Sequence, residues 1–144
     1  MPQRPVSQVI DRQEVFSVAP GASVIEAVRC MRDRRIGALM VVENERLVGI
    51  LSERDVVFRV VADERDARST RVADVMTASP ETILPDKPFS HALHMMYEGG
   101  FRHVPVVDAH GRAVGMVSAR DALDLEEREF GEALKQREHI RVIL

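Results

Sequence analysis

The sequence predicts an α/β protein in which two β-α-β-β-α repeats pack sheet to sheet as a pseudo-two-fold pair. Two observations predict this fold. The segment that begins at Pro20 is followed by a second copy that begins at Pro85. In each copy, apolar residues at helical spacing give way to short runs rich in β-branched residues. A unit of about 60 residues buries too little surface to be comfortably stable alone, so we expect the two copies to share one core.

The two copies match over most of their length. Val41-Val42-Glu43 aligns with Val106-Val107-Asp108 at an offset of 65 residues. The second copy has one extra residue in the next turn, and beyond it the offset is 66. We therefore divide the chain into a first repeat at residues 6–62, a polar linker at 63–71, a second repeat at 72–126 and a C-terminal helix and tail at 127–144.

Each repeat is expected to open with a short strand, at residues 15–18 in the first copy and 81–83 in the second. A helix should follow, because Val24, Val28 and Met31 lie at i, i+4 and i+7 on one helical face. Ser23 and Glu26, three residues apart, form the pattern of a capping box, which predicts the start of this helix.

A hairpin is expected next. Residues 37–42 and 46–51 are short apolar runs on either side of a polar turn. In the second copy, Pro105 predicts an edge or a bulge in the matching strand. Residues 52–62 return to helical spacing. Residues 122–137 are rich in Glu, Arg, Ala and Leu and should form a further helix, which ends in the apolar tail at 140–144.

Composition excludes several classes of protein. The chain has 144 residues, of which 45% are hydrophobic and 30% charged, as in a globular rather than a disordered protein. Its 20 basic and 23 acidic residues give a net charge of −3, and only 4% of residues are aromatic, so a nucleic-acid partner is not expected. The single cysteine excludes an internal disulfide, and no apolar run fits a signal peptide or a membrane span. We expect a cytoplasmic protein without a membrane partner.

The chemistry of the sequence lies in a motif that occurs twice, Gly-h-h-Ser-x-Arg-Asp, where h is apolar. It spans residues 49–55 and 115–121. In one interpretation the motif binds a nucleotide. The N-terminus of the following helix, the Ser and the Arg would hold a phosphate, and the Asp would accept hydrogen bonds from the ribose hydroxyls. In the other interpretation, Ser-x-x-Asp is only a capping box. The residues themselves leave both interpretations open.

The two halves resemble a tandem pair of CBS domains, the cystathionine-β-synthase-type module, together called a Bateman module. The resemblance covers about residues 6–126, and its carriers are the two motifs, residues 72–77 (VADVMT) and residues 101–108 (FRHVPVVD). It implies a non-enzymatic family that binds adenosyl ligands in clefts between paired modules and regulates an attached or partner protein. The candidate ligands are AMP, ADP, ATP, NAD and S-adenosylmethionine, and none is an obligatory cofactor.

In this family, each cleft combines the Ser and Asp of one module with the first strand and the hairpin of the other. The resemblance therefore implies two sets of ligand-binding residues. The first set is Ile50, Ser52, Arg54, Asp55, Thr82, Ile83, Arg102 and His103; the second set is Met116, Ser118, Arg120, Asp121, Ser17, Val18, Gly37 and Ala38. Because only the first set takes a cationic pair from the hairpin, Arg102 and His103, we expect the first cleft to bind phosphorylated nucleotide more tightly.

Other reactive residues have simpler interpretations. His91 and His94 lie three residues apart on an expected helix, but no third ligand follows at a convincing spacing, so a solvated helix face is favoured over a metal site. Cys30 lies among apolar residues without a partner that would activate it as a nucleophile, and is interpreted as a packed side chain. Met95 and Met96 are interpreted as core residues.

The sequence therefore predicts a stand-alone regulatory module that binds an adenosyl ligand, signals to an effector protein and pairs as a homodimer. No Walker loop, dinucleotide-binding motif or paired-metal motif is present, so we expect no enzyme activity. The alternative is a structural or interaction homodimer with empty clefts, whose Ser-x-x-Asp motifs only cap helices. The arginines of the linker alternate with acids and are expected in solvent: Arg65, Arg68 and Arg71.

Overall fold

The computed structural model describes residues 4–143, and it describes side chains for residues 4–137. Its larger sheet has four strands in the order β1-β2-β3-β4, with β1 parallel to β2 and the other neighbours antiparallel. The strands are β1 (Ser17–Val18), β2 (Ala38–Glu43), β3 (Arg46–Ser52) and β4 (Thr77–Ala78). The first three come from the first repeat, while β4 comes from the start of the second.

The smaller sheet belongs to the second repeat. It pairs β5 (His103–Val107) with β6 (Ala113–Ser118) in antiparallel register, and Ile83 adds a single parallel bridge to Val106 at the position that β1 has in the first repeat. The two sheets touch where β2 contacts β6. The prediction of an α/β protein with two repeated units is confirmed, and the expected strand at residues 81–83 is reduced to one bridge.

One helix of 11 residues lies in each repeat, α2 (Val24–Arg34) in the first and α5 (Phe89–Gly99) in the second. The predicted capping box is confirmed, because the Ser23 hydroxyl accepts from the backbone of Glu26 and the Glu26 carboxylate accepts from the backbone of Ser23. Helix α5 has Pro88 at its N-cap instead, and ends at Gly100, whose φ of 72° is the left-handed conformation that glycine adopts most easily.

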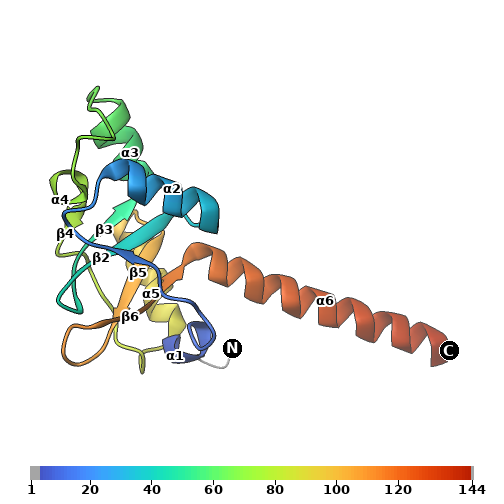
Figure 1. Ribbon diagram of the computed structural model, residues 1–144. Coiled ribbons are helices and arrows are strands. Elements are labelled where there is room, and N and C mark those ends of the chain that lie inside the picture. The colour runs from blue at the N-terminus through green and yellow to red at the C-terminus, as the bar shows by residue number, and fades with distance from the viewer. Residues whose placement is uncertain (1–3, 144) are drawn as a thin grey trace.

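The second helices of the two repeats differ in form. Helix α3 (Glu53–Val56) continues directly into one π-helical stretch, η1 (Val57–Val61), where a continuous α-helix was expected. Its counterpart, α6 (Ala119–Ile143), has 25 residues and projects away from the body of the protein, as Figure 1 shows in orange and red. Helix α6 includes the predicted segment 122–137 and continues into the expected tail, whose last residue, Leu144, lies outside the described residues.

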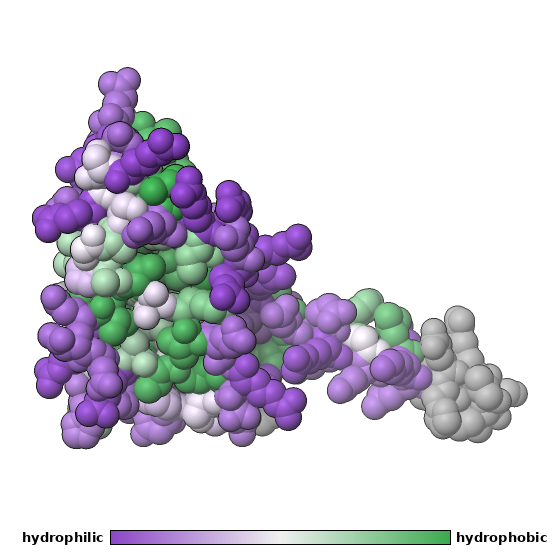
Figure 2. Space-filling view, in the orientation of Figure 1, coloured by the Kyte–Doolittle hydropathy of each residue, from purple (hydrophilic) through white to green (hydrophobic). Residues whose placement is uncertain are grey.

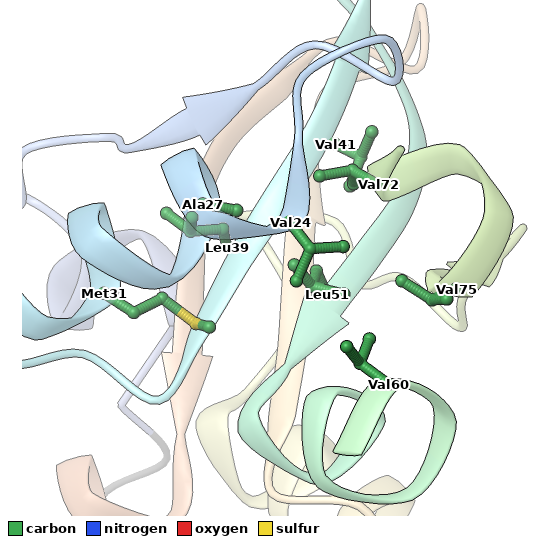
Figure 3. Packing of buried hydrophobic residues seen from close by; sticks show 9 residues of the cluster. All are labelled: Val24, Ala27, Met31, Leu39, Val41, Leu51, Val60, Val72 and Val75. Atoms are coloured by element: carbon green, nitrogen blue, oxygen red, sulfur yellow. The ribbon is translucent and has the colours of Figure 1, made fainter. Parts of the chain in front are cut away.

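The first core lies between the larger sheet and α2, and it includes residues from beyond the linker. Val72 and Val75, on the short helix α4 (Val72–Val75), are buried against Leu51 and Val60 (Figure 3). Full burial of one such side chain stabilises the fold by about 1.5–3 kcal/mol. The members of this core are Val24, Ala27, Met31, Leu39, Val41, Leu51, Val60, Val72 and Val75.

The second core makes the reciprocal exchange. Val6, on the short helix α1 (Val6–Val9), is fully buried among residues of the second repeat, and the backbone N–H of Val6 donates to the carbonyl of Lys87 at 2.8 Å. The members of this core are Val6, Ile83, Phe89, Ala92, Met96, Val104, Val106 and Val117. Each repeat therefore contributes its opening helix to the core of the other, an exchange that the hydrophobic pattern did not predict.

The prediction for Pro105 needs a correction. The register shift in β5 lies between Val106 and Val107, and β2 has the same shift between Val41 and Val42, where there is no proline. Strand β5 is not an edge at this point, because the Pro105 carbonyl accepts from the backbone of Ile83 at 3.1 Å while Pro105 pairs with β6 on its other side. The bulge is therefore a property of the repeat and not of the proline.

Several large apolar side chains remain on the surface. Most of them lie on η1 and along α6, and Figure 2 shows apolar surface (green) on the body and on the projecting helix. Those more than half exposed on these helices are Val57, Phe58, Val61, Leu123 and Phe130. None of the described helices is both long and apolar enough to cross a membrane.

Candidate ligand-binding cleft

Both copies of the motif form helix caps. The backbone of Ser52 donates to Asp55 Oδ2 at 2.9 Å, and the Ser52 hydroxyl accepts from the backbone of Asp55 at 3.2 Å. In the second copy the backbone of Ser118 donates to Asp121 Oδ2 at 2.7 Å, and the Ser118 hydroxyl lies 3.5 Å from the same oxygen. The capping box is thus confirmed as local structure in the first copy, while the second copy makes, of the two bonds of the box, only the one from the serine backbone to the aspartate. Each of these caps uses the Oδ2 of its aspartate. Whether the aspartate can also bind a ligand therefore depends on what surrounds its Oδ1.

The second oxygen is occupied in one copy and not in the other. Asp55 Oδ1 accepts from the Thr77 hydroxyl at 3.3 Å and lies 3.8 Å from Nη1 of Arg59. Thr77 reaches this oxygen because β4 is paired with β3 beside the cap. For Asp121, only Oδ2 has a hydrogen bond among the described residues. One carboxylate is therefore fully used by the fold, and the other keeps an acceptor for a ligand.

Burial affects Asp121 as well. Loss of solvent raises the pKa of its carboxyl above the usual value, and the hydrogen bond from the Ser118 backbone partly opposes this shift. A carboxylate that has lost solvent and keeps a free oxygen gains from two hydroxyl donors, because they replace the water that it has lost. Asp121 is thus suited to accept hydrogen bonds from the hydroxyls of a ribose.

A large cleft of about 1360 Å³ opens beside Asp121. It lies where the end of β6 and the start of α6 meet α2, β2 and α3 of the first repeat. This volume exceeds the roughly 300–1000 Å³ of most small-molecule sites, so a mononucleotide would fit with room to spare. Predicted residues that line it are Met116, Ser118, Arg120, Asp121, Gly37 and Ala38 from the second set, and Arg102 and His103 from the first.

The predicted first set is not brought together around one cavity. Thr82 and Ile83 line a separate, smaller cavity of about 590 Å³. Ile50 is buried, and the Nη1 of Arg54 donates to the carbonyl of Gly100 at 3.1 Å, which ties α3 to the end of α5. Four predicted residues of the first set line neither cavity, namely Ile50, Ser52, Arg54 and Asp55. Ser17 and Val18 of the second set are also absent from the lining, although the preceding Phe16 is part of it.

The large cleft carries cationic groups on several sides. Arg35, Arg102 and Arg120 line it, and none of them has a carboxylate within ion-pair distance among the described residues. Arg35 lies at the C-cap of α2 with a φ of 54°, where it ends the helix at the cleft. Arginine binds phosphate through paired N–H groups, so these residues favour an anionic ligand.

His103 lies between the two repeats in this cleft. A Cβ added to Gly37 would come within 3.5 Å of His103 Cε1 and within 2.9 Å of Glu53 Oε1, so both side chains lie directly over this glycine. Burial lowers the pKa of the His103 imidazole below its usual value, and the carboxylates of Glu53 and Asp121 partly offset this effect. A lowered pKa favours a neutral imidazole in the empty cleft at neutral pH.

The lining of this cleft also includes residues that sequence reasoning missed, among them four with polar or aromatic side chains: Gln13, Phe16, Arg35 and Glu53. Three of them lie outside the repeated motif, and Glu53 occupies its variable position. Only Arg35 had a signal in the sequence, since it directly follows a predicted helix and precedes a predicted strand. The two histidines His91 and His94 line the smaller cavity, where His94 Nε2 lies 3.1 Å from Glu98 Oε1. Among the described residues, no group of three His, Cys, Asp or Glu could hold a metal ion.

Comparison with known proteins agrees with this architecture. The family model of the CBS domain matches residues 6–62 and again residues 72–128. An uncharacterised 17.7 kDa protein of Acidianus ambivalens is 34% identical over 136 residues, which cover 91% of this chain and 80% of that protein. CBSCBSPB1 of Arabidopsis thaliana is 36% identical over 107 residues, which cover 74% of this chain but only 20% of that protein.

Solved structures are similar as well. A putative signal-transduction protein with CBS domains from Burkholderia ambifaria superposes with a TM-score of 0.77 at 31% identity, covering 83% of this chain and 90% of that one. The CBS domain protein PAE2072 from Pyrobaculum aerophilum, complexed with AMP, superposes with a TM-score of 0.75 at 28% identity, covering 81% of this chain and 88% of that one.

Proposed function

This chain belongs to the CBS domain family, with two domains in tandem, and on that basis we propose that it is a regulatory module that binds an adenosyl ligand in the large cleft. One observation carries the proposal: Asp121, whose Oδ1 has no hydrogen bond among the described residues, lines a cleft with three arginines that have no ion pair in that part of the chain. A carboxylate for ribose hydroxyls and cations for phosphate are the two features that a nucleotide requires. The complex of the Pyrobaculum protein supports AMP as the first ligand to test.

Each predicted residue of the cleft has a proposed role. Asp121 accepts from the ribose hydroxyls, and Ser118 and Arg120 hold the phosphate at the start of α6. Arg102, just before β5 of the same repeat, adds positive charge, and His103 becomes charged when a phosphate is bound. Met116 supplies an apolar contact for the base, and Gly37 and Ala38 keep the wall of the cleft low enough to admit it.

We propose that the second set of residues, and not the first, forms the tighter site. The expectation from sequence relied on Arg102 and His103 for the first cleft, but both line the same cavity as Asp121. Asp55 meanwhile gives its second oxygen to Thr77. Ile50, Ser52, Arg54 and Asp55, with Thr82 and Ile83, are proposed to be a weaker site that requires Thr77 to move.

Thermal shift and calorimetry test the proposal. A ligand at a hundred times its dissociation constant stabilises the native state by about 2.7 kcal/mol, so AMP at millimolar concentration should raise the melting temperature of the wild-type protein. The same screen ranks ADP, ATP, NAD and S-adenosylmethionine. No shift with any of these ligands would overturn nucleotide binding.

The second candidate function is a structural homodimer with empty clefts. It is favoured by the exposed side chains of Val57, Phe58 and Val61, which no described part of the chain covers. A homodimer is also compatible with ligand binding, and we propose this surface, with the exposed side chains of α6, as the place where two copies meet. Sedimentation of Phe58→Ser against wild type decides whether this surface pairs. We further propose that the module signals to an effector protein in the cytoplasm and catalyses no reaction itself.

A further inference from the structure

The two sheets end differently at the strand that carries the motif. In the larger sheet, Gly49 and Ile50 of β3 pair with Ala78 and Thr77 of β4. In the smaller sheet, the matching strand β6 has no fourth strand beside it within the described residues. The N–H and C=O of Met116 are instead both bound by one side chain. Gln13 Nε2 donates to the Met116 carbonyl at 2.8 Å, and the Met116 N–H donates to Gln13 Oε1 at 2.8 Å.

A glutamine is chemically suited to this position. Its carboxamide carries a donor and an acceptor side by side, as a peptide group does, so one side chain satisfies both main-chain groups of a strand residue. Glutamate would accept from the Met116 N–H but would place a negative charge beside the carbonyl. Alanine would leave both groups to solvent. Among the described residues, Gln13 thus takes the place of an edge strand.

The bond fixes a segment that has no regular structure of its own. Residues 11–16, which we term the wall segment, connect α1 to β1 and contain neither helix nor strand. Gln13, Glu14, Val15 and Phe16 line the large cleft, as does Met116 on the other side of the bond. The wall segment makes two further contacts. The Phe16 ring lies 4.6 Å from the guanidinium of Arg34, and the Gln13 backbone N–H donates to the Ile10 carbonyl at 3.0 Å.

The wall segment also leaves Asp121 accessible. Thr77 stands opposite Ile50 in the larger sheet, and at the matching position of β6, Met116, the partner is Gln13. The Gln13 carboxamide is engaged by the Met116 backbone, and no hydrogen bond joins it to Asp121 in the described part of the chain. The Gln13 side chain, in place of a strand, thus holds β6 and leaves the Oδ1 of Asp121 without a hydrogen bond from this segment.

We propose that Gln13 is a positioning residue that holds the wall segment against β6 and thereby sets the affinity of the large cleft for its ligand. The proposal rests on the proposed function, because it concerns the same cleft. A wall that is already ordered costs less conformational entropy when the ligand binds than a wall that must be ordered by it. The bond is retained in the complex, and its loss weakens binding.

Three variants test this proposal: Gln13→Ala, Gln13→Glu and, as the matched control, Gln8→Ala on the exposed face of α1. Hydrogen exchange of the Met116 amide in the ligand-free protein measures the bond directly, and calorimetry with AMP measures its effect on the cleft. Gln13→Ala should speed Met116 exchange and weaken AMP binding, each by about three- to tenfold, as expected for two exposed hydrogen bonds. Gln13→Glu should retain part of the Met116 protection yet weaken AMP binding further, because it adds negative charge at the cleft. Gln8→Ala should change neither measurement.

Each other outcome has a defined meaning. Unchanged Met116 exchange in Gln13→Ala overturns the bond itself. Faster exchange with unchanged AMP affinity overturns the positioning role and leaves Gln13 as a structural residue. If the wild-type protein binds none of AMP, ADP, ATP, NAD and S-adenosylmethionine, the proposed function fails and the affinity role fails with it, while the exchange measurement still decides whether Gln13 secures β6.

Discussion

The two repeats keep the same cap and differ in what surrounds it. In both repeats the serine at the end of the strand donates its backbone N–H to the aspartate three residues later, Asp55 in the first and Asp121 in the second. Thr77 then covers the first aspartate, whereas Gln13 secures the neighbouring strand of the second and leaves the carboxylate open. The comparison teaches that the motif supplies the local geometry, while residues outside the motif decide whether a ligand can use it.

Removal of a large core side chain should have the largest effect and tests whether the repeats fold as separate units. Leu51 is fully buried in the first core, and Leu51→Ala should lower the free energy of unfolding by about 2–5 kcal/mol. Because α1 and α4 are exchanged between the cores, we expect one cooperative transition in chemical denaturation, followed by circular dichroism. The matched Val117→Ala in the second core removes fewer atoms and should cost less, in the same single transition. Two separate transitions in either variant would show that the repeats are independent.

Substitution of the two aspartates tests the difference in ligand access. Asp121→Ala should weaken AMP binding about ten- to a hundredfold, because it removes a charged acceptor of two hydrogen bonds. Asp55→Ala should leave AMP affinity nearly unchanged and lower stability by about 0.5–2 kcal/mol through loss of the α3 cap. Calorimetry and denaturation of both variants measure these quantities. Equal losses of affinity would mean that both repeats bind ligand alike, and a larger loss in Asp55→Ala would restore the order expected from sequence.

The pH dependence of binding provides the smallest expected effect. His103 has a lowered pKa in the empty cleft because it is buried, and it faces Glu53, Asp121 and Arg102. A bound phosphate would favour the imidazolium and raise this pKa, so the protein should take up a proton on binding, and the His103 contribution to affinity should grow as the pH falls below 7. Its magnitude should be less than about tenfold in the dissociation constant.

His103→Gln isolates this contribution. The phosphate of AMP titrates near a pKa of about 6 in both proteins, so its own effect cancels when the variant is compared with wild type. Proton uptake is measured by calorimetry in two buffers of different ionisation enthalpy. Equal uptake in both proteins would exclude His103 from the phosphate site. The same lowered pKa also affects stability: the unfolded chain binds the extra proton, so without ligand wild type should gain stability as the pH rises toward 6.5, and His103→Gln should gain less.

Much of this fold could be predicted because the repeat contains the local signals. The capping box of α2, the hairpins and the start of α6 follow from side-chain spacing and capping chemistry over a few residues. The exchange of α1 and α4 could not be predicted in this way, because Val6, Val72 and Val75 have the same apolar character in either core. The π-helical turn of η1 likewise has no signature in residues 57–61, which are mostly β-branched and apolar.

The candidate site was predictable in part, for a related reason. The repeated residues Ser118, Arg120 and Asp121 do lie on the large cleft, as the motif suggested. Carrying the family pattern onto Arg102 and His103 assigned them to the first cleft, because a sequence does not tell which of two adjoining cavities a side chain enters. Gln13 had no signal at all, since its partner is the backbone of Met116, more than a hundred residues away, and any residue type there would present the same groups.

The exchanged helices make this chain the intramolecular equivalent of a domain-swapped dimer. Helix α1 completes the second core and α4 completes the first, with the linker at 63–71 joining the two halves. The linker keeps each donated helix at a high effective concentration near its acceptor, so the swap closes within one molecule rather than between two. Cutting the chain at the linker would release two halves that each present an unfilled groove and a helix that fits the other. Such halves should reassemble by complementation, to an extent that depends on the protein concentration.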